Sequence, residues 1–336
     1  MAFRTVVKIL EVFSEKLLLA LAIPSEHQDL PVKHEDVTVL NMTVGANFKG
    51  EDIENKISEV TISAGSEPQY VLSDNAHNLV RGILDSGNVH YADISHSMGV
   101  ILKKVYEKQF DFVELTTLLG KKRLQYHLTN KAYLLPPNMR TIARFMNMSE
   151  WVIWGNSMLA CYNKLPKEMQ EAYAFINDYE SLLQELMDAI RHIEHICKNK
   201  GFSCKTSKEC QSYIVAHVIG NAYPRQANLG LKMLEYFRKE EAQLTEDMNI
   251  CISSDIIEST FGIYKSKKSP NKLYGITPFA LMIPLYPKVV NESVTKTFNF
   301  KERLVNVKLK DIDAWTTEHL SKNWVTERTK TLKQVS

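Results

Sequence analysis

The chain has 336 residues, of which 44% are hydrophobic and 24% are charged, so it has the composition of a globular protein that can bury a sizeable core. No run of apolar residues reaches the roughly 18 that a membrane span needs, which excludes a membrane-spanning protein. The five cysteines have no framework spacing, which favours a reducing compartment and indicates a cytoplasmic protein.

The net charge of +2 conceals an uneven distribution of charge along the chain. Residues 259–336 contain 14 Lys and Arg against 6 Asp and Glu, whereas residues 1–258 contain 27 Lys and Arg against 33 Asp and Glu. A basic C-terminal segment on a slightly acidic body is typical of a protein that contacts a polyanion such as nucleic acid. A solvated basic surface explains the same imbalance, so charge alone leaves both interpretations open.

The first hundred residues are predicted to alternate between strands and helices. Apolar and β-branched runs predict strands at residues 16–23, 36–44, 70–72 and 89–94. Helical spacing of apolar residues predicts one helix at residues 50–64, closed by Gly65, and a second from about residue 74, closed by Gly87. This order of elements predicts an α/β fold.

Residues 97–245 change in character, because their apolar residues follow helical spacing and no alternating strand pattern is found. The longest predicted helix covers residues 179–197 and ends before Gly201. Another helix is predicted at residues 249–265, with a cap at Ser253 or Ser254, and shorter ones at 277–285 and 310–323. A large helical block is therefore expected between the α/β segment and a mixed C-terminal region.

Acidic residues follow two of the predicted strands. Asp74 comes directly after the strand of residues 70–72, and Asp93, with His96, ends the next strand. Because open α/β sheets carry their sites at the carboxyl ends of the strands, Asp74 is the first candidate for chemistry. Two structural interpretations remain open: Asp74 as a helix N-cap, and Asp93 with His96 as a hydrogen-bonded pair that fixes a turn.

A second candidate lies on the predicted helix of residues 249–265. Glu258 and Lys265 are seven residues apart, so two helical turns place them on one face, where a carboxylate and a lysine can serve a metal ion and a phosphate together. Lys267, Lys268 and Lys272 follow with no acid among them. This favours a functional site over the alternative, a surface ion pair.

Taken in order, these motifs resemble a DDE transposase of the bacterial insertion-sequence type, over about residues 15–323. Each motif is short, and it is their order and spacing that carry the resemblance. They are YVLSD ending in Asp74, D-x2-H from Asp93 to His96, LLPPNMRTIARFMN at residues 134–147, which resembles part of a helical insertion, and E-x6-K from Glu258 to Lys265.

The resemblance implies an α/β fold with a ribonuclease H-like core that is interrupted by a large all-helical insertion. It divides the chain into a first part of the core at residues 1–109, a helical insertion at 110–248, a core helix with the third acid and a basic segment at 249–287, and a basic helical tail at 288–336.

The implied activity is DNA transposition, in which phosphodiester hydrolysis and strand transfer at the element's ends use two Mg²⁺ or Mn²⁺ ions. Asp74 and Glu258 would be catalytic metal ligands, with Asp93, His96 and Lys265 in support. The expected partners are DNA and a second copy of the chain in a homodimer, in the cytoplasm at the bacterial nucleoid. The residues expected to contact DNA are Lys265, Lys267, Lys268, Lys272, Arg140 and Arg144, of which Arg140 and Arg144 can equally be solvated.

The chain departs from the family at the first acid, which the family carries on its opening strand and uses to bridge both metal ions. Residues 1–14 contain no Asp, and the nearest substitutes are Glu11, Asp29 and Asp36. We therefore expect a transposase that is truncated at its N-terminus.

A second departure lies upstream of Glu258, where Cys251 and Ser254 stand in place of the family's Tyr and Arg. The alternative to an active enzyme is a catalytically inactive, truncated or repurposed transposase that binds DNA or partner subunits. An unrelated helical interaction protein is the third possibility.

Overall fold

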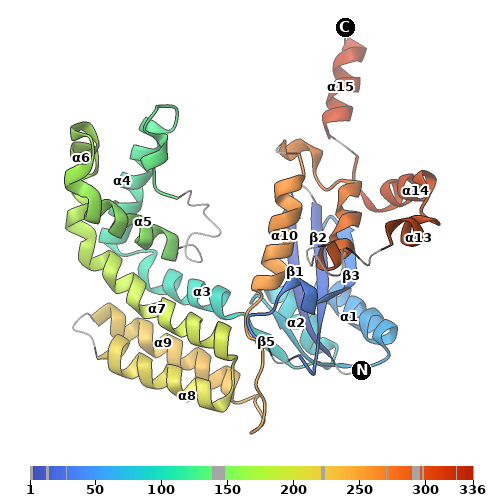
Figure 1. Ribbon diagram of the computed structural model, residues 1–336, viewed down its shortest axis with the longest axis horizontal. Helices are drawn as coiled ribbons and strands as arrows, with labels where there is room; N and C mark the ends of the chain where they lie inside the picture. The colour runs from blue at the N-terminus through green and yellow to red at the C-terminus, as the bar shows by residue number, and fades with distance from the viewer. Residues whose placement is uncertain are drawn as a thin grey trace. The chain divides into compact units, whose positions relative to one another are not determined.

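The computed structural model describes residues 3–12, 15–27, 29–137, 148–220, 224–269, 271–289, 296, 299–322 and 324–335. The chain folds into two compact units, drawn in Figure 1. Residues 1–93 and 252–336 form the first unit, and residues 94–251 form the second. The second unit is thus inserted into the sequence of the first.

The first unit contains a five-stranded sheet in the order β3-β2-β1-β4-β5. The central strand β1 pairs antiparallel with β2 and parallel with β4, β3 pairs antiparallel with β2, and β5 pairs parallel with β4. The carboxyl ends of β1, β4 and β5 therefore point in one direction. The strands are β1 (Phe3–Val12), β2 (Glu15–Pro24), β3 (Thr38–Gly45), β4 (Pro68–Ser73) and β5 (His90–Ala92).

One face of this sheet is covered by α1 (Gly50–Ala64) and α2 (His77–Asp85), as Figure 1 shows. Both helices bury the apolar stripe that their sequences predict. α1 ends at Gly65, whose φ of 68° lies in the left-handed region that glycine adopts without strain. The core on this face consists of Phe3, Val7, Leu18, Ala20, Ala22, Phe48, Ile53, Ile57, Val60, Val71, Leu79 and Ile83.

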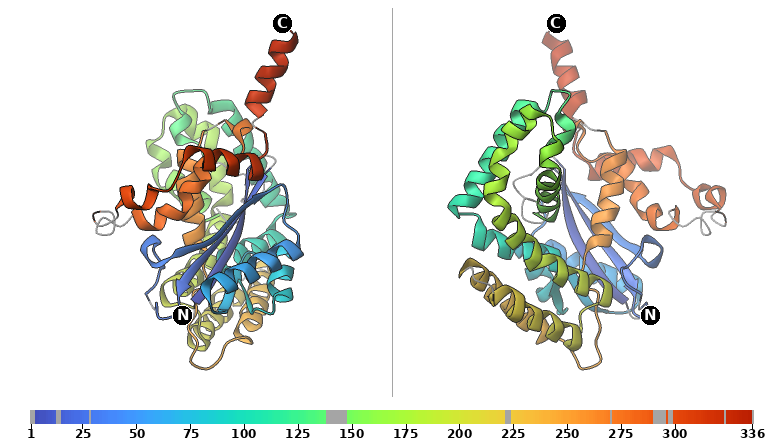
Figure 2. Two further views of the ribbon diagram at one scale, coloured as in Figure 1. Left: turned by 90° about the vertical axis from the view of Figure 1, so that its right-hand side faces the viewer. Right: turned by 60° about the vertical axis from the view of Figure 1, so that its left-hand side comes forward.

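The opposite face of the sheet lies next to α10 (Asp255–Lys267), as Figures 1 and 2 show. Successive side chains of a strand point to opposite faces, and Val7 belongs to the core under α1 and α2, so its neighbour Lys8 points toward α10. α10 buries a helical stripe that includes Ile257, Phe261 and Tyr264. The sheet is therefore enclosed between two helical layers, as expected for strands that are apolar on both faces.

The chain after α10 belongs to the first unit and is anchored by a buried carboxylate, Glu15. Glu15 accepts hydrogen bonds from the backbone N–H groups of Ile276, at 2.9 Å, and Ser321, at 2.6 Å. These contacts hold two separate parts of the C-terminal segment at the start of β2. That segment contains a 3₁₀ helix (Pro278–Leu285), α11 (Tyr286–Val289), α13 (Phe300–Leu304), α14 (Leu309–His319) and α15 (Trp324–Val335).

The described secondary-structure elements of the second unit are all helices, apart from a single β-bridge between Phe202 and Ile250. Its helix α3 packs against α7 and α9, and α5 packs against α7. Between α8 and α9 the chain forms one π-helical segment, Ile214–Ile219. The α-helices are α3 (Ile94–Tyr106), α4 (Phe110–Tyr126), α5 (Met148–Cys161), α6 (Lys167–Tyr173), α7 (Glu180–Lys200), α8 (Cys204–Tyr213) and α9 (Pro224–Glu241).

The mixed α/β class predicted from the sequence is confirmed, while several boundaries differ. No strand is predicted before residue 16, and this is wrong, because Phe3–Val12 form β1. The helix predicted at 249–265 begins only at Asp255, since Ile250 pairs with Phe202 as extended backbone. The helical unit begins at Ile94, earlier than the insertion expected at 110–248, because α3 packs with α7 and α9.

Across the residues that the structure places, no helix combines the length and the apolar character that crossing a membrane requires.

Candidate functional site

Lys8 lies on β1, and Asp74 comes directly after the neighbouring parallel strand β4. The pairing of β1 with β4 places Val6 opposite Leu72, and two residues further along each chain lie Lys8 and Asp74. Lys8 is buried, with 8% of its surface exposed, whereas Asp74 is half-buried just beyond the end of β4. A lysine of the central strand therefore stands beside the first candidate acid.

Asp74 lies in the turn that joins β4 to α2. Its Oδ1 accepts a hydrogen bond from the N–H of Ala76 at 3.1 Å, while α2 begins at His77 with Ala76 as its N-cap. Asp74 thus fixes the approach to the helix by a short Asx-type turn. The alternative interpretation of Asp74 as the N-cap of α2 is wrong, because the N-cap is Ala76.

Asp93 follows β5 and is almost completely buried, with 1% of its surface exposed. Its N–H donates to the carbonyl of Ser73 at 2.9 Å, and its Oδ2 accepts from the N–H of Ser254 at 2.6 Å. Ser254 is the N-cap residue of α10, where unpaired N–H groups and the helix dipole favour a negative charge. Asp93 therefore ties the start of α10 to the end of β5.

Glu258 lies one turn further along α10, on the side that faces the sheet. Its Oε1 forms an ion pair with Nζ of Lys8, and the two side chains are 40% and 10% exposed. The central strand and the helix are therefore joined by a direct contact between a cation and the third candidate acid.

The charges around Lys8 explain why it stays protonated inside the protein. Burial alone lowers the pKa of a lysine, but the charge and the hydrogen bond of Glu258 and the charges of Asp93 and Asp74 outweigh it, so the pKa of Lys8 is raised. Lys8 is thus a cation at neutral pH, within the electrostatic reach of three carboxylates. Lys8, Asp74, Asp93 and Glu258 are called the Lys8 cluster below.

The remaining predicted site residues lie outside the Lys8 cluster. His96 is a half-buried residue of α3 in the second unit. Lys265 and Lys267 are exposed on the last turns of α10, and Lys268 follows at its C-cap, where burial and the charge of Lys265 lower its pKa. Lys272 lies in a short 3₁₀ helix (Lys272–Tyr274) and its side chain is outside the described residues, as are Arg140 and Arg144, in residues 138–147.

Three residues were proposed to replace the missing first acid, and none of the contacts that the structure describes for them reaches the Lys8 cluster. Glu11, towards the end of β1, pairs with Lys16 at 3.1 Å, and its side chain is 63% exposed. Asp36 pairs with His27 at 3.4 Å, and Asp29 is an exposed loop residue. The residue that β1 contributes to the cluster is therefore Lys8.

The residues present do not form the all-carboxylate site that the resemblance implies. Such a site needs an acid on the central strand beside Asp74, and the side chain found there is the cation Lys8. Within the described ranges, no three His, Cys, Asp or Glu side chains are grouped so that they could hold one metal ion. The residues present thus differ from the expected metal ligands in their charge, because one of them is a cation, and in the number of carboxylates.

Lys8 is the site residue that sequence reasoning missed. β1 has the sequence FRTVVKILEV, and its buried charged residues, Arg4 and Lys8, lie on one face of the strand by their even spacing. A lysine in the middle of an apolar run is a signal of a buried partner, because burying an unpaired charge is costly. The partner, Glu258, is 250 residues away in sequence, and nothing local in the sequence identifies it.

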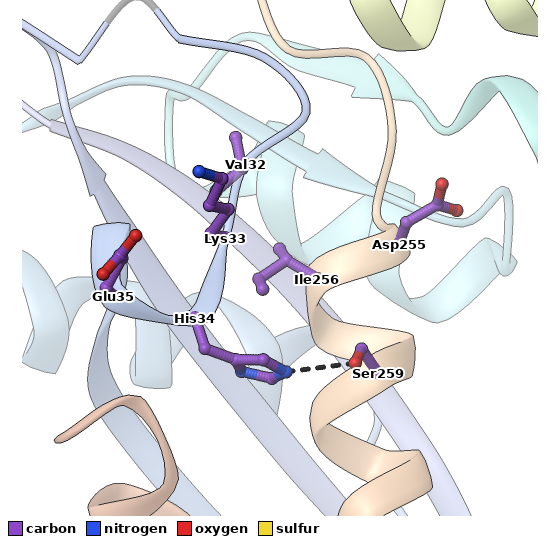
Figure 3. Close-up of a pocket in the computed structure, with 7 residues that line it drawn as sticks. All are labelled: Val32, Lys33, His34, Glu35, Asp255, Ile256 and Ser259. Carbon is purple, nitrogen blue, oxygen red and sulfur yellow. Dashed lines mark hydrogen bonds between the residues drawn. The ribbon is translucent and has the colours of Figure 1, made fainter. Parts of the chain in front are cut away.

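A separate open pocket of about 450 Å³ lies on another side of α10, between the helix and residues 32–35 (Figure 3). In Figure 3 the ring of His34 points to Ser259, and Nε2 lies 3.0 Å from the Ser259 hydroxyl. Burial lowers the pKa of His34, so the neutral ring is favoured. The pocket lining mixes charges with apolar groups and comprises Val32, Lys33, His34, Glu35, Asp255, Ile256 and Ser259.

Comparison of the chain with models of known protein families finds no match, and comparison with curated proteins finds no similar protein. The geometry of the Lys8 cluster therefore carries the functional conclusion.

Proposed function

We propose that this chain is a DNA-binding protein derived from a DDE transposase, and that it binds DNA without cleaving it. The observation that carries this proposal is the ion pair between Lys8 of β1 and Glu258 of α10. A protonated lysine thus lies on the strand that, by the resemblance, would carry the metal-bridging acid.

The arrangement of the first unit supports descent from such an enzyme. β2 and β3 flank the central strand on one side, where β2 runs antiparallel to both of its neighbours, and β4 and β5 flank it on the other side and run parallel to it. Asp74 and Asp93 follow the parallel strands, and Glu258 lies on a helix that follows the helical unit in sequence. This is the order that a ribonuclease H-like core with a helical insertion would have.

The chemistry explains why Lys8 favours binding over cleavage. Metal-dependent phosphoryl transfer needs a cation with open coordination positions, which activates water and holds the attacking and leaving oxygens. A lysine ammonium has no coordination sphere and donates hydrogen bonds only. Lys8 is already paired with Glu258, so it neutralises that carboxylate without supplying this chemistry.

DNA binding is supported by the basic character of the chain beyond the Lys8 cluster. Lys265 and Lys267 are exposed at the C-terminal end of α10, and residues 259–336 carry 14 Lys and Arg against 6 Asp and Glu. Lysines that neutralise phosphates release counter-ions, so the affinity for DNA should fall steeply with salt concentration.

Fluorescence anisotropy with a short labelled duplex over a range of salt concentrations tests this proposal. Replacing both Lys265 and Lys267 with Gln should weaken binding and lower the salt slope by about one to two, since each lost phosphate contact removes about 0.9. A matched control replaces Lys205 and Lys208, two exposed residues of α8, with Gln and makes the same change in net charge. Equal losses in both double variants would contradict a DNA contact at α10.

The second candidate is metal-dependent transposition, which is favoured by the three acids Asp74, Asp93 and Glu258 within the electrostatic reach of Lys8. Incubation of duplex and plasmid DNA with Mg²⁺ or Mn²⁺ separates the two functions. Cleavage that is lost in Asp74→Asn and in Glu258→Gln would establish the enzyme. Intact DNA, together with salt-sensitive binding, agrees with the function proposed here.

A further inference from the structure

We infer that the ε-ammonium group of Lys8 is the built-in counter-ion of the Asp74, Asp93 and Glu258 carboxylates, so that the first unit folds without a divalent cation and excludes one from the Lys8 cluster. This inference rests on the proposed function, because it concerns the same side chains, and extends it from DNA to the stability and ion binding of the protein.

The Lys8 side chain lies between the central strand and α10. It extends from the central strand on the face opposite the α1 and α2 core, and reaches Glu258 on α10. With 8% of its surface exposed, its side chain fills the space between strand and helix. A divalent cation that joined acids of these elements would have to occupy the same space.

Two contacts attach α10 to the sheet. Asp93 holds the N-terminus of the helix through the N–H of Ser254, and Lys8 holds the next turn through Glu258. Both contacts pair a carboxylate with a positively polarised or positively charged partner from another element. In a metal site, an ion shared by carboxylates would link the same elements, so Lys8 supplies that link within the chain itself.

The Lys8 cluster contains one cation and three carboxylates. The Lys8 ammonium pairs with Glu258 and also lies within the electrostatic reach of Asp93 and Asp74, so its removal leaves these negative charges without that cation in a partly buried place. Replacement of Lys8 by Asp adds a fourth carboxylate and frees space. Carboxylate oxygens are the ligands that Mg²⁺ and Mn²⁺ prefer, so this variant should depend on the ions that the natural protein excludes.

The test compares melting temperatures of the full chain in EDTA, in Mg²⁺ and in Mn²⁺. The natural protein should melt at the same temperature in all three. Lys8→Asp should melt several degrees lower in EDTA and recover in a saturable way with Mn²⁺. The matched control, Lys8→Asp combined with Glu258→Gln, should lose most of that recovery.

Lys8→Gln keeps the inference testable if Lys8→Asp does not fold in EDTA, because Gln is longer than Asp and adds no negative charge. It should be less stable than the natural protein and show a smaller saturable response to Mn²⁺. A folded Lys8→Asp without any response would overturn the inference. So would a Mn²⁺-dependent rise in the natural protein that disappears in Glu258→Gln.

The test of this inference can be separated from the test of the proposed function, because it measures melting temperature and not DNA binding. Loss of DNA binding with the expected Mn²⁺ pattern would remove the proposed function alone. DNA binding with a metal-responsive natural protein would remove only the inference about Lys8.

Discussion

Lys8 and Glu258 form an ion pair that joins the central strand of the sheet to helix α10 across 250 residues of sequence. The lysine is the more deeply buried partner, and it also lies within the electrostatic reach of Asp74 and Asp93. The pair therefore links the fold of the first unit to the chemistry of its acids. Replacing either Lys8 or Glu258 should therefore affect both the fold of the first unit and the chemistry of its acids.

Replacement of Lys8 by Met should lower the free energy of unfolding by about 1–3 kcal/mol. Breaking a buried ion pair costs about 3–5 kcal/mol, and the 40% exposure of Glu258 reduces that cost through solvent screening. Met retains most of the volume, so packing losses are small. Urea denaturation measures the change, and Lys56→Met, which removes an exposed i,i+3 pair with Glu59, should cost less than about 0.5 kcal/mol.

The ion pair should also make stability depend on pH in the alkaline range. The pKa of Lys8 is raised above its ordinary value of 10.5, so its contribution is fully present below that value and is lost as pH rises through the higher pKa of the folded state. The difference in unfolding free energy between the natural protein and Lys8→Met should therefore be constant at neutral pH and shrink above about pH 10.5. A difference that stays constant into strongly alkaline solution would contradict a charged Lys8 in the fold.

Glu15 should be essential for holding the C-terminal segment. Its buried carboxylate accepts a buried hydrogen bond from the N–H of Ile276 and a part-buried one from the N–H of Ser321, and a buried donor left without an acceptor costs about 1–3 kcal/mol. Glu15→Ala should accordingly lower stability by about 2–4 kcal/mol and speed hydrogen exchange at both amides. Glu11→Ala, at an exposed residue near the end of β1, is the control and should leave exchange at Ile276 and Ser321 unchanged.

Cys197 should react slowly with alkylating reagents. A hydrogen bond with Cys210, whose sulfur lies 3.9 Å away, together with burial, raises the pKa of the Cys197 thiol, and only the thiolate is the nucleophile. Iodoacetamide labelling followed by peptide mass spectrometry should show Cys161 and Cys204, which are half-buried, modified first. Labelling of Cys197 as fast as Cys204 in the folded protein would contradict the buried position.

Much of the first unit was predictable, because local sequence signals determine its elements. Residues 50–64 carry a helical stripe followed by Gly65, and α1 has these bounds. β1 was missed because Arg4 and Lys8 interrupt its apolar pattern, and their burial becomes explicable only with partners elsewhere in the fold. The late start of α10 likewise depends on a contact between distant residues, Phe202 and Ile250.

The candidate site was predictable on its acidic side alone. Asp74 and Asp93 were singled out by their positions after predicted strands, and Glu258 by its spacing to Lys265 on a predicted helix; the structure places them after β4, after β5 and on α10. Two things were not readable from the sequence: the pairing of β1 with β4, which puts Lys8 beside Asp74, and the approach of α10 to β1. Both are tertiary contacts, which no local pattern encodes.

The most direct test of the account is a titration of the natural protein with Mn²⁺, followed by electron paramagnetic resonance, beside Glu258→Gln. If Lys8 replaces a metal ion, both proteins should bind the same small amount of Mn²⁺, with no site that depends on Glu258. A stoichiometric Mn²⁺ site in the natural protein that is lost in Glu258→Gln would show that the acids bind metal despite Lys8, and would contradict the account.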